Sequence, residues 1–363
     1  MSPERTLRIL SGEDRSLLAR GLRPLLTMAS WGYTAATDYR NWRYDRGRNR
    51  IHRVDVPIIS VGNLTAGGTG KTPTVAWLAN WLRGAGESPG ILSRGYHALD
   101  GADSERSEND EKRVLDLHCP GIPHVQNKER FDGAVSLIAE HDVSVIVLDD
   151  GFQHRRLHRD FDLVLIDALN PFGFGHLLPR GLLRERKANL RRADAILITR
   201  CESSSDSQVE AIQDELSRWT DAPVYRTAFT PTRLINREGQ TQPLELAATR
   251  SVCAFCGIGN PQGFRRTLAG LGAPVTDKKF RSFPDHYHYT EADLKQISEM
   301  GIASHAELFL TTQKDLVKMP RSELSGRPIY AVEIALTFRD DTGPLFEQFN
   351  SALKTRHRPE DNG

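Results

Sequence analysis

A glycine-rich loop that ends in Lys71 and Thr72 carries the clearest chemical signal in this sequence of 363 residues. Its glycines lack Cβ atoms, so consecutive backbone N–H groups can turn towards a phosphate. A catalytic lysine at this position neutralises the β- and γ-phosphates of a nucleotide, and the hydroxyl of the next threonine is a ligand for Mg²⁺. A binding site for a nucleoside triphosphate is therefore predicted at Thr65, Ala66, Gly67, Gly68, Thr69, Gly70, Lys71 and Thr72.

The residues on either side of the loop predict the strand and the helix that position it. Residues 57–61 are a short β-branched run typical of a buried strand, and Pro73 suits the first turn of a helix, where its missing N–H would have no partner. The unpaired amides and the positive end of that helix would favour a bound anion. Thr65 departs from the consensus, which has glycine there, and the alternative is a glycine-rich turn without a ligand. The apolar residues that follow at helical spacing are Val75, Leu78, Ala79 and Leu82.

Two adjacent carboxylates, Asp149 and Asp150, end the next strongly apolar run, residues 143–148. A carboxylate at the C-terminal end of a buried parallel strand beside a P-loop is placed to hold Mg²⁺, directly or through water. We therefore predict Asp149 as a metal ligand and Asp150 as a catalytic carboxylate, although without a P-loop such a pair would indicate a turn. Gln153 and His154 are predicted to face the same region and contact the substrate, and His154 is equally suited to a structural hydrogen bond.

The rest of the chain predicts an α/β protein with a parallel sheet. Strand-like runs alternate with helical stretches, a pattern typical of sheets whose ligands lie beyond the C-terminal ends of the strands. Residues 225–249 resemble a linker, and a second α/β unit begins at Ser251. We therefore predict a P-loop kinase-like domain at residues 51–235 and a smaller C-terminal α/β domain at residues 236–363. The other expected strands are residues 89–93, 162–166, 195–199 and 308–312.

Composition restricts the class of protein. A net charge of +1 argues against a generally basic nucleic-acid-binding protein. The four cysteines and the lack of a signal peptide favour a reducing compartment. Cys253 and Cys256 form a CxxC sequence, but they lie in an apolar run that indicates a strand, where positions i and i+3 face opposite sides. A buried strand is therefore predicted there, rather than a metal or redox site.

The N-terminal segment, residues 1–50, combines leucines, aromatic residues and clustered arginines. No uninterrupted apolar run reaches the roughly 18 residues needed to span a bilayer. The pattern fits an amphipathic helix lying on an anionic membrane surface, with Trp31 and Trp42 at the level of the headgroups. The alternative, which the composition favours equally, is a helix that packs on its own domain with a solvated basic loop behind it. Nucleic-acid binding is a weaker third interpretation.

Four segments together resemble one family, the tetraacyldisaccharide 4′-kinases of lipid A biosynthesis. The segments are VGNLTAGGTGKTP (61–73), LSRGY (92–96), LDDGFQHRRLHRD (148–160) and FPDHYHYT (283–290), and LLPRGLLRE (177–185) and TTQKDLVK (311–318) also fit. The resemblance implies transfer of the γ-phosphate of ATP, with Mg²⁺, to the 4′-hydroxyl of a lipid disaccharide 1-phosphate at the cytoplasmic face of the bacterial inner membrane. The expected partners are this lipid and an anionic membrane surface, with no obligate protein partner evident.

The resemblance also implies roles for individual residues. Asp110 stands where the family has a catalytic aspartate, although Asn109 and Lys112 replace the usual flanking Gly and Pro. His286 matches the histidine proposed to pair with that aspartate, and Tyr287 stands where a second histidine is common. A carboxylate held by a histidine suits an acceptor alcohol that must lose its proton, and the site is expected to form between two domains. The positions associated with the sugar phosphate hold Arg94, Arg130 and Arg184.

Two other classes of protein compete with this interpretation. Partitioning-type and metal-insertion P-loop NTPases have loops similar to AGGTGKT, but they place a signature lysine where this chain has Ala66. A membrane-surface nucleotide switch is the third class, and it would leave Asp110 and His286 without a purpose. Consumption of ATP that depends stoichiometrically on a lipid disaccharide would separate a kinase from both.

Overall fold

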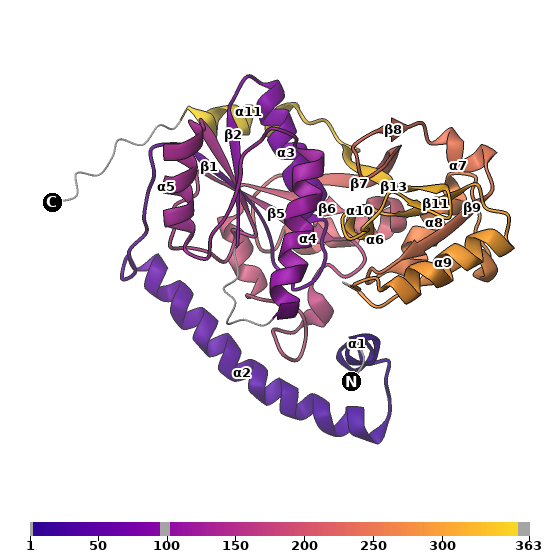
Figure 1. The fold of residues 1–363 in the computed structure, drawn as a ribbon. Coiled ribbons are helices and arrows are strands. Elements are labelled where there is room, and N and C mark those ends of the chain that lie inside the picture. The colour runs from indigo at the N-terminus through magenta and orange to yellow at the C-terminus, as the bar shows by residue number, and fades with distance from the viewer. Residues whose placement is uncertain (1–2, 95–101, 286, 355–363) are drawn as a thin grey trace. The chain divides into compact units, whose positions relative to one another are not determined.

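The structure, a computed structural model, describes residues 3–94, 102–285 and 287–354. It divides into two units, each built around strands of mainly parallel β-sheet (Figure 1). Unit 1 comprises residues 1–95, 122–228 and 337–363, and unit 2 comprises residues 96–121 and 229–336. The α/β fold class with a parallel P-loop-type sheet is confirmed.

The sheet of unit 1 positions the glycine-rich loop. Its strands lie in the order β3-β2-β4-β1-β5-β6-β7, and each neighbouring pair is parallel. Strands β1, β2, β4, β5 and β6 are buried along their whole length, which agrees with their continuous apolar sequences. The strands are β1 (Ile58–Asn63), β2 (Pro89–Ser93), β3 (His124–Gln126), β4 (Val145–Asp149), β5 (Phe161–Asp167), β6 (Ala195–Thr199) and the start of β7 (Val224–Ile235).

The helices of unit 1 enclose this sheet in apolar side chains. Helix α5 adds Ala134 and Leu137 to a cluster around Ile146, and α6 adds Ile212 to another cluster around Val164. Short 3₁₀ turns occur at Gly173–Gly175, Lys187–Arg192 and Cys201–Ser203. The α-helices are α1 (Pro3–Ser11), α2 (Leu17–Asp45), α3 (Lys71–Gly84), α5 (Arg130–His141), α6 (Asp206–Leu216) and α11 (Gly343–Leu353).

Unit 2 has its own sheet, in which β9 and β11 are central. The strand order is β10-β9-β11-β13-β7, and β10, β9, β11 and β13 pair in parallel. The antiparallel strands β8 (Thr241–Gln242) and β12 (Glu323–Leu324) pair with β7 and β13. The larger strands are β9 (Val252–Cys256), β10 (Phe280–Ser282), β11 (Leu308–Thr312) and β13 (Arg327–Phe338), and the helices are α4 (Ala102–His118), α7 (Glu245–Thr249), α8 (Pro261–Gly270), α9 (Glu291–Ala303) and α10 (Gln313–Leu316).

The linker predicted at residues 225–249 is wrong, because residues 225–235 belong to the twelve-residue strand β7 (Val224–Ile235). Buried residues in β7 do not follow one simple alternation, and its partners β6, β8 and β13 include strands distant in the sequence. Local composition therefore hides the strand. The capping box at Thr290 and Asp293 is present at the start of α9, and β2, β6 and β11 have the bounds predicted for them.

The two units also differ from the predicted ranges 51–235 and 236–363. Helix α4 belongs to unit 2, where Leu117 packs against its core, and the C-terminal helix α11 belongs to unit 1. In unit 1, the rings of Phe346 and Trp81 are stacked 4.9 Å apart, and Phe349 lies 4.9 Å from Phe161. Such packing joins segments far apart in the sequence, so a single division of the chain could not describe it.

The CxxC sequence lies in β9, as the interpretation of a buried strand predicts. Cys253 packs in one hydrophobic cluster of unit 2 and Cys256 in another, so the two thiols face opposite sides of the sheet. Burial raises the pKa of both thiols, and that of Cys256 to about 12. A thiol with such a pKa is neither a ready nucleophile nor a ready metal ligand.

Candidate functional site

The glycine-rich loop connects β1 to α3 in a shape that suits a bound anion. Gly67 has φ +115° and Gly70 has φ +89°, backbone angles that residues other than glycine rarely adopt. A Cβ at Gly67 would meet no atom within 4 Å. Gly70 precedes α3 as its N-cap residue and has no side chain that could hydrogen-bond to the first amides of the helix. These N–H groups are therefore available for a phosphate group at the helix N-terminus.

Side chains outside the loop hold its backbone. Asn63 Nδ2 donates to the Thr65 carbonyl at 2.7 Å and to Thr69 Oγ1 at 3.0 Å. Thr199 Oγ1 donates to the Thr69 carbonyl at 2.9 Å, and Arg200 Nη2 donates to the Gly68 carbonyl at 2.6 Å. The sequence interpretation did not single out Asn63, Thr199 or Arg200. Their position at the C-terminal ends of strands β1 and β6 was the available signal.

Lys71 lies beside a carboxylate that it shares with an arginine. Its Nζ is 3.5 Å from Asp150 Oδ1, and Arg184 Nη1 donates to both carboxylate oxygens of Asp150 at 2.8 Å. Burial alone would raise the pKa of Asp150, but Lys71 and Arg184 outweigh burial and lower it to about 2. Asp150 follows the last residue of β4 directly. Its φ of +54° is uncommon for a residue other than glycine. The structure thus brings together three residues predicted separately.

Asp149, the predicted metal ligand, is the buried last residue of β4. The register pairs it with Val61 of β1, the strand that leads into the loop. Thr72 lies in the first turn of α3 and is half-buried. Among the residues that the structure describes, no group of three or more His, Cys, Asp and Glu side chains could hold a metal ion. Mg²⁺ commonly uses only one or two carboxylates together with substrate phosphates, so Thr72 and Asp149 stay a prediction as its ligands.

A basic region surrounds His154, four residues after Asp150. Burial lowers the pKa of His154 to about 4, and the nearby guanidinium groups of Arg130, Arg159, Arg156 and Arg94 lower it further in the same direction. Arg130 is buried at the start of α5, where its Nη1 donates to the carbonyl of Asn127 at 2.8 Å. Arg94 is exposed directly after β2. Arg94 and Arg130, two of the arginines predicted to bind the sugar phosphate, are therefore both close enough to His154 to lower its pKa.

Gln153 is an internal support of the site. Its Nε2 donates to the Asn63 carbonyl at 2.9 Å, and its Oε1 accepts a longer bond of 3.4 Å from Arg184. Gln153 therefore joins the end of β1 to the arginine that binds Asp150. This arrangement gives it a structural contact in addition to the substrate contact predicted from the sequence.

We expect the imidazole of His154 to stay neutral between pH 5 and pH 8, because its pKa of about 4 lies below the ordinary 6.5. Unfolded chains would take up a proton first on acidification, so the folded state loses stability as the pH falls from 6.5 towards about 4. A ¹H–¹⁵N NMR titration of the histidine side chains checks this, with His154→Gln identifying the signal. A midpoint near 6.5 for that signal would contradict the expectation.

The predicted catalytic aspartate lies in unit 2. Asp110 is a buried residue of α4, and Lys318 Nζ lies 3.5 Å from its Oδ2. Its predicted partner His286 lies outside the described residues. Lys318 lies in the segment TTQKDLVK that resembles the family, and its own signal in the sequence is a lysine among the apolar residues Leu316, Val317 and Met319.

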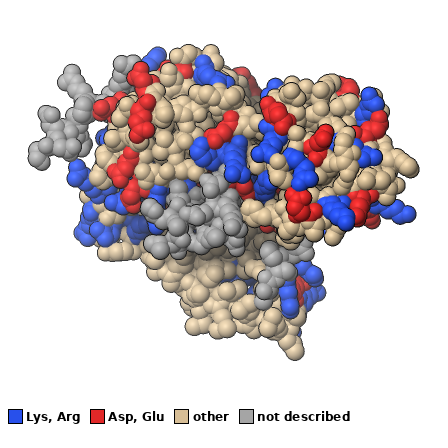
Figure 2. All heavy atoms as spheres, in the orientation of Figure 1, with Lys and Arg blue, Asp and Glu red and all other residues tan. Residues whose placement is uncertain are grey.

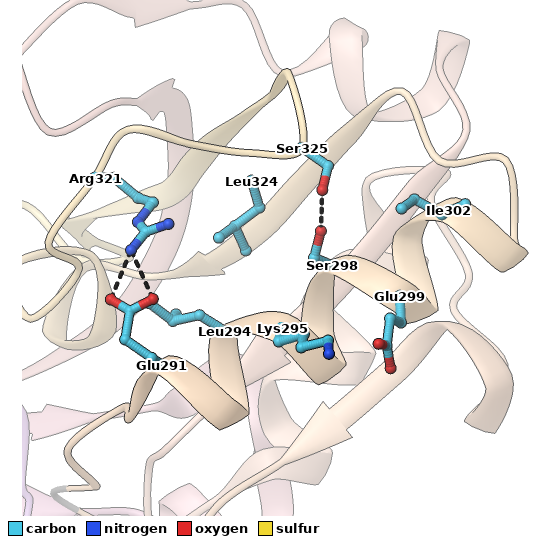
Figure 3. Close-up of a pocket in the computed structure, with 9 residues that line it drawn as sticks. All are labelled: Glu291, Leu294, Lys295, Ser298, Glu299, Ile302, Arg321, Leu324 and Ser325. Carbon is cyan, nitrogen blue, oxygen red and sulfur yellow. Dashed lines mark hydrogen bonds and ion pairs between the residues drawn. The ribbon is translucent and has the colours of Figure 1, made fainter.

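A hollow of about 410 Å³ beside α9 contains none of these residues (Figure 3). Four of its polar residues interact in pairs: Arg321 binds the carboxylate of Glu291, and Ser298 contacts Ser325 through their hydroxyl groups. Lys295 and Glu299 give its rim mixed charge. None of the residues predicted to bind ATP, metal or substrate lines this hollow.

Helix α2 has two different faces. Its polar face packs on unit 1, where Ser30 donates to the Leu177 carbonyl, Tyr33 to the Arg184 carbonyl and Asn41 to Glu185. The opposite face exposes large apolar side chains. In Figure 2, Lys and Arg side chains gather at the left edge of the molecule, where α2 ends in Figure 1. The exposed residues are Leu17, Leu18, Leu25, Met28, Trp31, Tyr39 and Trp42.

The packing of α2 on unit 1 agrees with the second alternative for the N-terminal segment, and the membrane surface of the first alternative stays a prediction for the exposed apolar face. In the part of the chain that the structure describes, no helix has both the length and the hydropathy required to cross a membrane. An exposed apolar face of this kind indicates a surface that binds another molecule or a lipid.

Comparisons with known proteins agree on one family. Residues 22–354 match the family described as Tetraacyldisaccharide-1-P 4′-kinase. The tetraacyldisaccharide 4′-kinase of Syntrophus aciditrophicus is 37% identical over 344 residues, which cover 89% of this chain and 90% of that protein. The protein of the same name from Geobacter sulfurreducens is 34% identical, covering 91% and 93%. The crystal structure of LpxK from Aquifex aeolicus in complex with ATP has a TM-score of 0.71 and 30% identity, covering 92% of this chain and 99% of that one.

Proposed function

Because the chain belongs to the tetraacyldisaccharide-1-P 4′-kinase family, we propose that it transfers the γ-phosphate of ATP to the 4′-hydroxyl of a tetraacyldisaccharide 1-phosphate. The observation that carries this proposal is the arrangement in unit 1 of an uncapped helix N-terminus, Lys71, and the Asp150–Arg184 pair. These groups suit the phosphates of a nucleotide. The competing NTPase assignment is not favoured, because the family match extends over nearly the whole chain.

ATP would lie with its phosphates against the loop from Thr65 to Thr72. The open space at Gly67 and the positive φ angles at Gly67 and Gly70 fit close approach of backbone N–H groups to phosphate oxygens. Lys71 would bind the β- and γ-phosphates, and its contact with Asp150 would orient the ammonium group before ATP binds. The structure of the Aquifex aeolicus relative was determined in complex with ATP, which supports this assignment.

Mg²⁺ fits the oxygen donors at this place. The Thr72 hydroxyl and the Asp149 carboxylate are hard ligands of the kind that Mg²⁺ prefers, and Asp149 lies at the end of the strand beside β1. Thr72 and Asp149 would hold the ion, which would supply positive charge to offset the negative charge of the phosphates during transfer. Asp150 already binds Lys71 and Arg184, so we assign it to orienting these cations rather than to the metal.

The acceptor hydroxyl would lose its proton to Asp110. A bond forms between the 4′-oxygen and the γ-phosphorus, the bond from phosphorus to the bridging oxygen breaks, and ADP leaves with that electron pair. The hydroxyl proton passes to the Asp110 carboxylate, which His286 would orient. Arg94 and Arg130, near His154, would bind the 1-phosphate of the acceptor, and Arg184 would stabilise charge at the transferring group.

The acceptor carries four acyl chains, so the enzyme would work at a membrane surface. Exposing each CH₂ to water would cost about 0.8 kcal/mol, and docking on the bilayer avoids most of this cost. The exposed face of α2 supplies apolar contact. The arginines from Arg40 to Arg53, at its C-terminal end and just after it, would meet anionic lipid. We propose the cytoplasmic face of the inner membrane of a bacterium as the location, with α2 lying in the interface.

We expect Leu25→Glu with Trp31→Glu to weaken binding to anionic vesicles roughly tenfold or more, because two large apolar side chains would no longer enter the interface. Both residues are exposed, so the fold should be retained. The apparent KM for lipid should rise, while the KM for ATP stays nearly unchanged. Trp219→Glu, at another exposed tryptophan of unit 1, is the matched control. Vesicle flotation at low and high salt is the measurement, and undiminished, salt-insensitive binding would exclude α2 as the anchor.

The direct test of the reaction is an assay with [γ-³²P]ATP and a tetraacyldisaccharide 1-phosphate in mixed micelles. We expect label in the lipid in one-to-one proportion with ADP, and little ADP without lipid. If the ADP formed equals the ATP consumed and no label enters the lipid, the chain is an NTPase. Nucleotide binding without turnover would instead indicate a switch protein.

A further inference from the structure

A buried lysine with two carboxylate neighbours lies in unit 2, the unit that carries the proposed base. Lys318 follows α10 and its side chain is only 3% exposed. Its Nζ lies 3.5 Å from Asp110 Oδ2 and 3.9 Å from Asp315 Oδ1, and both carboxylates are buried. Lysine is rarely buried so fully unless its charge is compensated. The positive charge of Lys318 is therefore compensated by one or both of these carboxylates.

The two carboxylates differ in what else supports them. Burial raises the pKa of Asp315, although its hydrogen bonds and Lys318 oppose this. Asp110 Oδ2 accepts no hydrogen bond from the described residues and faces Lys318. Asp315, in contrast, accepts hydrogen bonds from three neutral donors: Thr312 Oγ1 at 2.6 Å, Gly257 N at 3.0 Å and Tyr289 OH at 3.0 Å. Lys318 therefore serves Asp110 more than it serves Asp315.

Stability alone does not account for this lysine. A buried ion pair is often no more stabilising than apolar side chains of the same volume. The segments that carry Asp110 and Lys318 are also joined by a second ion pair, Glu111 with Lys314 at 3.4 Å, which is partly exposed. A buried charge beside a proposed proton acceptor is, in contrast, a common feature of enzyme active sites.

We propose that Lys318 is a positioning residue that fixes the Asp110 carboxylate for proton transfer from the acceptor hydroxyl, a role that rests on the function proposed above. Lys318 belongs to the turn that follows α10, where its N–H donates to the Asp315 carbonyl at 3.0 Å. Asp315 in turn is fixed by the three donors just described. The base is thus supported through Lys318 by the C-terminal end of β11, a central strand of unit 2.

We expect Lys318→Met in the full chain to lower kcat about 10- to 100-fold, because a base contributes roughly 10²- to 10⁴-fold and a misplaced base keeps part of this. The KM values for ATP and for lipid should change less than about twofold, since Lys318 contacts neither substrate in this role. Lys318→Arg keeps the charge and should recover part of kcat. Lys314→Met is the matched control, because it removes the neighbouring ion pair, and its kcat should stay within about twofold of the parent.

A second background separates positioning from a purely structural role. When Asp110→Asn has already removed the base, adding Lys318→Met should cause no further loss of kcat. Should Lys318→Met fail to fold, Lys318→Gln takes its place, with folding checked by circular dichroism. A folded Lys318→Met or Lys318→Gln variant with parental kcat, or a full additional loss in the Asp110→Asn background, would overturn the proposal.

These outcomes remain distinct from a failure of the proposed function. If Asp110→Asn abolishes activity while the folded Lys318 variants keep it, only the positioning role is refuted. If Asp110→Asn itself keeps parental kcat, the assignment of the base is refuted and the role of Lys318 falls with it.

Discussion

Lys71→Ala is expected to lower kcat by roughly two orders of magnitude or more, because it removes the charge that stabilises the transferring phosphoryl group. The variant should fold, since Asp150 keeps both hydrogen bonds to Arg184. Steady-state phosphate transfer to the lipid disaccharide is the measurement. A kcat within a few-fold of the parent would show that the loop does not bind the phosphates of ATP as we describe.

Lys187→Ala is the matched control for this experiment. Lys187 lies in unit 1 and forms an ion pair with Glu215 at 2.8 Å, but it is outside the loop and its supports. Its loss should leave kcat within about twofold of the parent, because ion pairs near the surface contribute little and Glu215 keeps its contacts with Arg218 and Trp219. A similar loss in both variants would point to general destabilisation rather than to phosphate binding.

Asp110→Asn is expected to lower kcat about 10²- to 10⁴-fold, the usual contribution of a general base. The amide keeps the shape of the carboxylate but cannot accept the hydroxyl proton. If His286 orients Asp110, then His286→Ala should lose activity by the same mechanism. The double variant should then lose about as much as the worse single variant. Pre-steady-state measurement of phosphate transfer, with ATP binding measured separately, checks the three variants.

Asp116→Asn is the control for the aspartate, because it makes the same substitution on α4 at a partly exposed residue paired with Lys112. Its activity should remain near that of the parent. Losses in log kcat that add fully between Asp110→Asn and His286→Ala would show that the two residues serve separate steps. The base would then need another orienting partner.

The loop and most strands of unit 1 could be predicted from the sequence, because their signals are local. The bounds of β2 and β6 agree with short apolar runs, and the start of α3 agrees with Lys71 and the helical spacing that follows. The sheet is parallel and its strands are buried on both faces, so continuous apolar runs identified them. The same local logic placed Asp149 and Asp150 at the end of β4.

Contacts between distant residues could not be predicted in this way. The pair formed by Asp150 and Arg184 joins positions 34 residues apart, and Lys318 lies 208 residues after Asp110 in the sequence. Strand β7 was hidden because its partners come from elsewhere in the chain. The faces of α2 were also undecided, because only the packing of Ser30, Tyr33 and Asn41 on unit 1 shows which face remains exposed.

The membership of α11 in unit 1 has a consequence for synthesis on the ribosome. Phe346 and Phe349 pack against Trp77, Trp81 and Phe161, which are translated much earlier. Until α11 emerges from the ribosome, the nascent unit 1 must expose the side chains of Trp77, Trp81 and Phe161. Chains that expose apolar surface are prone to aggregation or chaperone binding. A premature stop codon before Gly343 would therefore spare every proposed site residue and still prevent this aromatic cluster from forming.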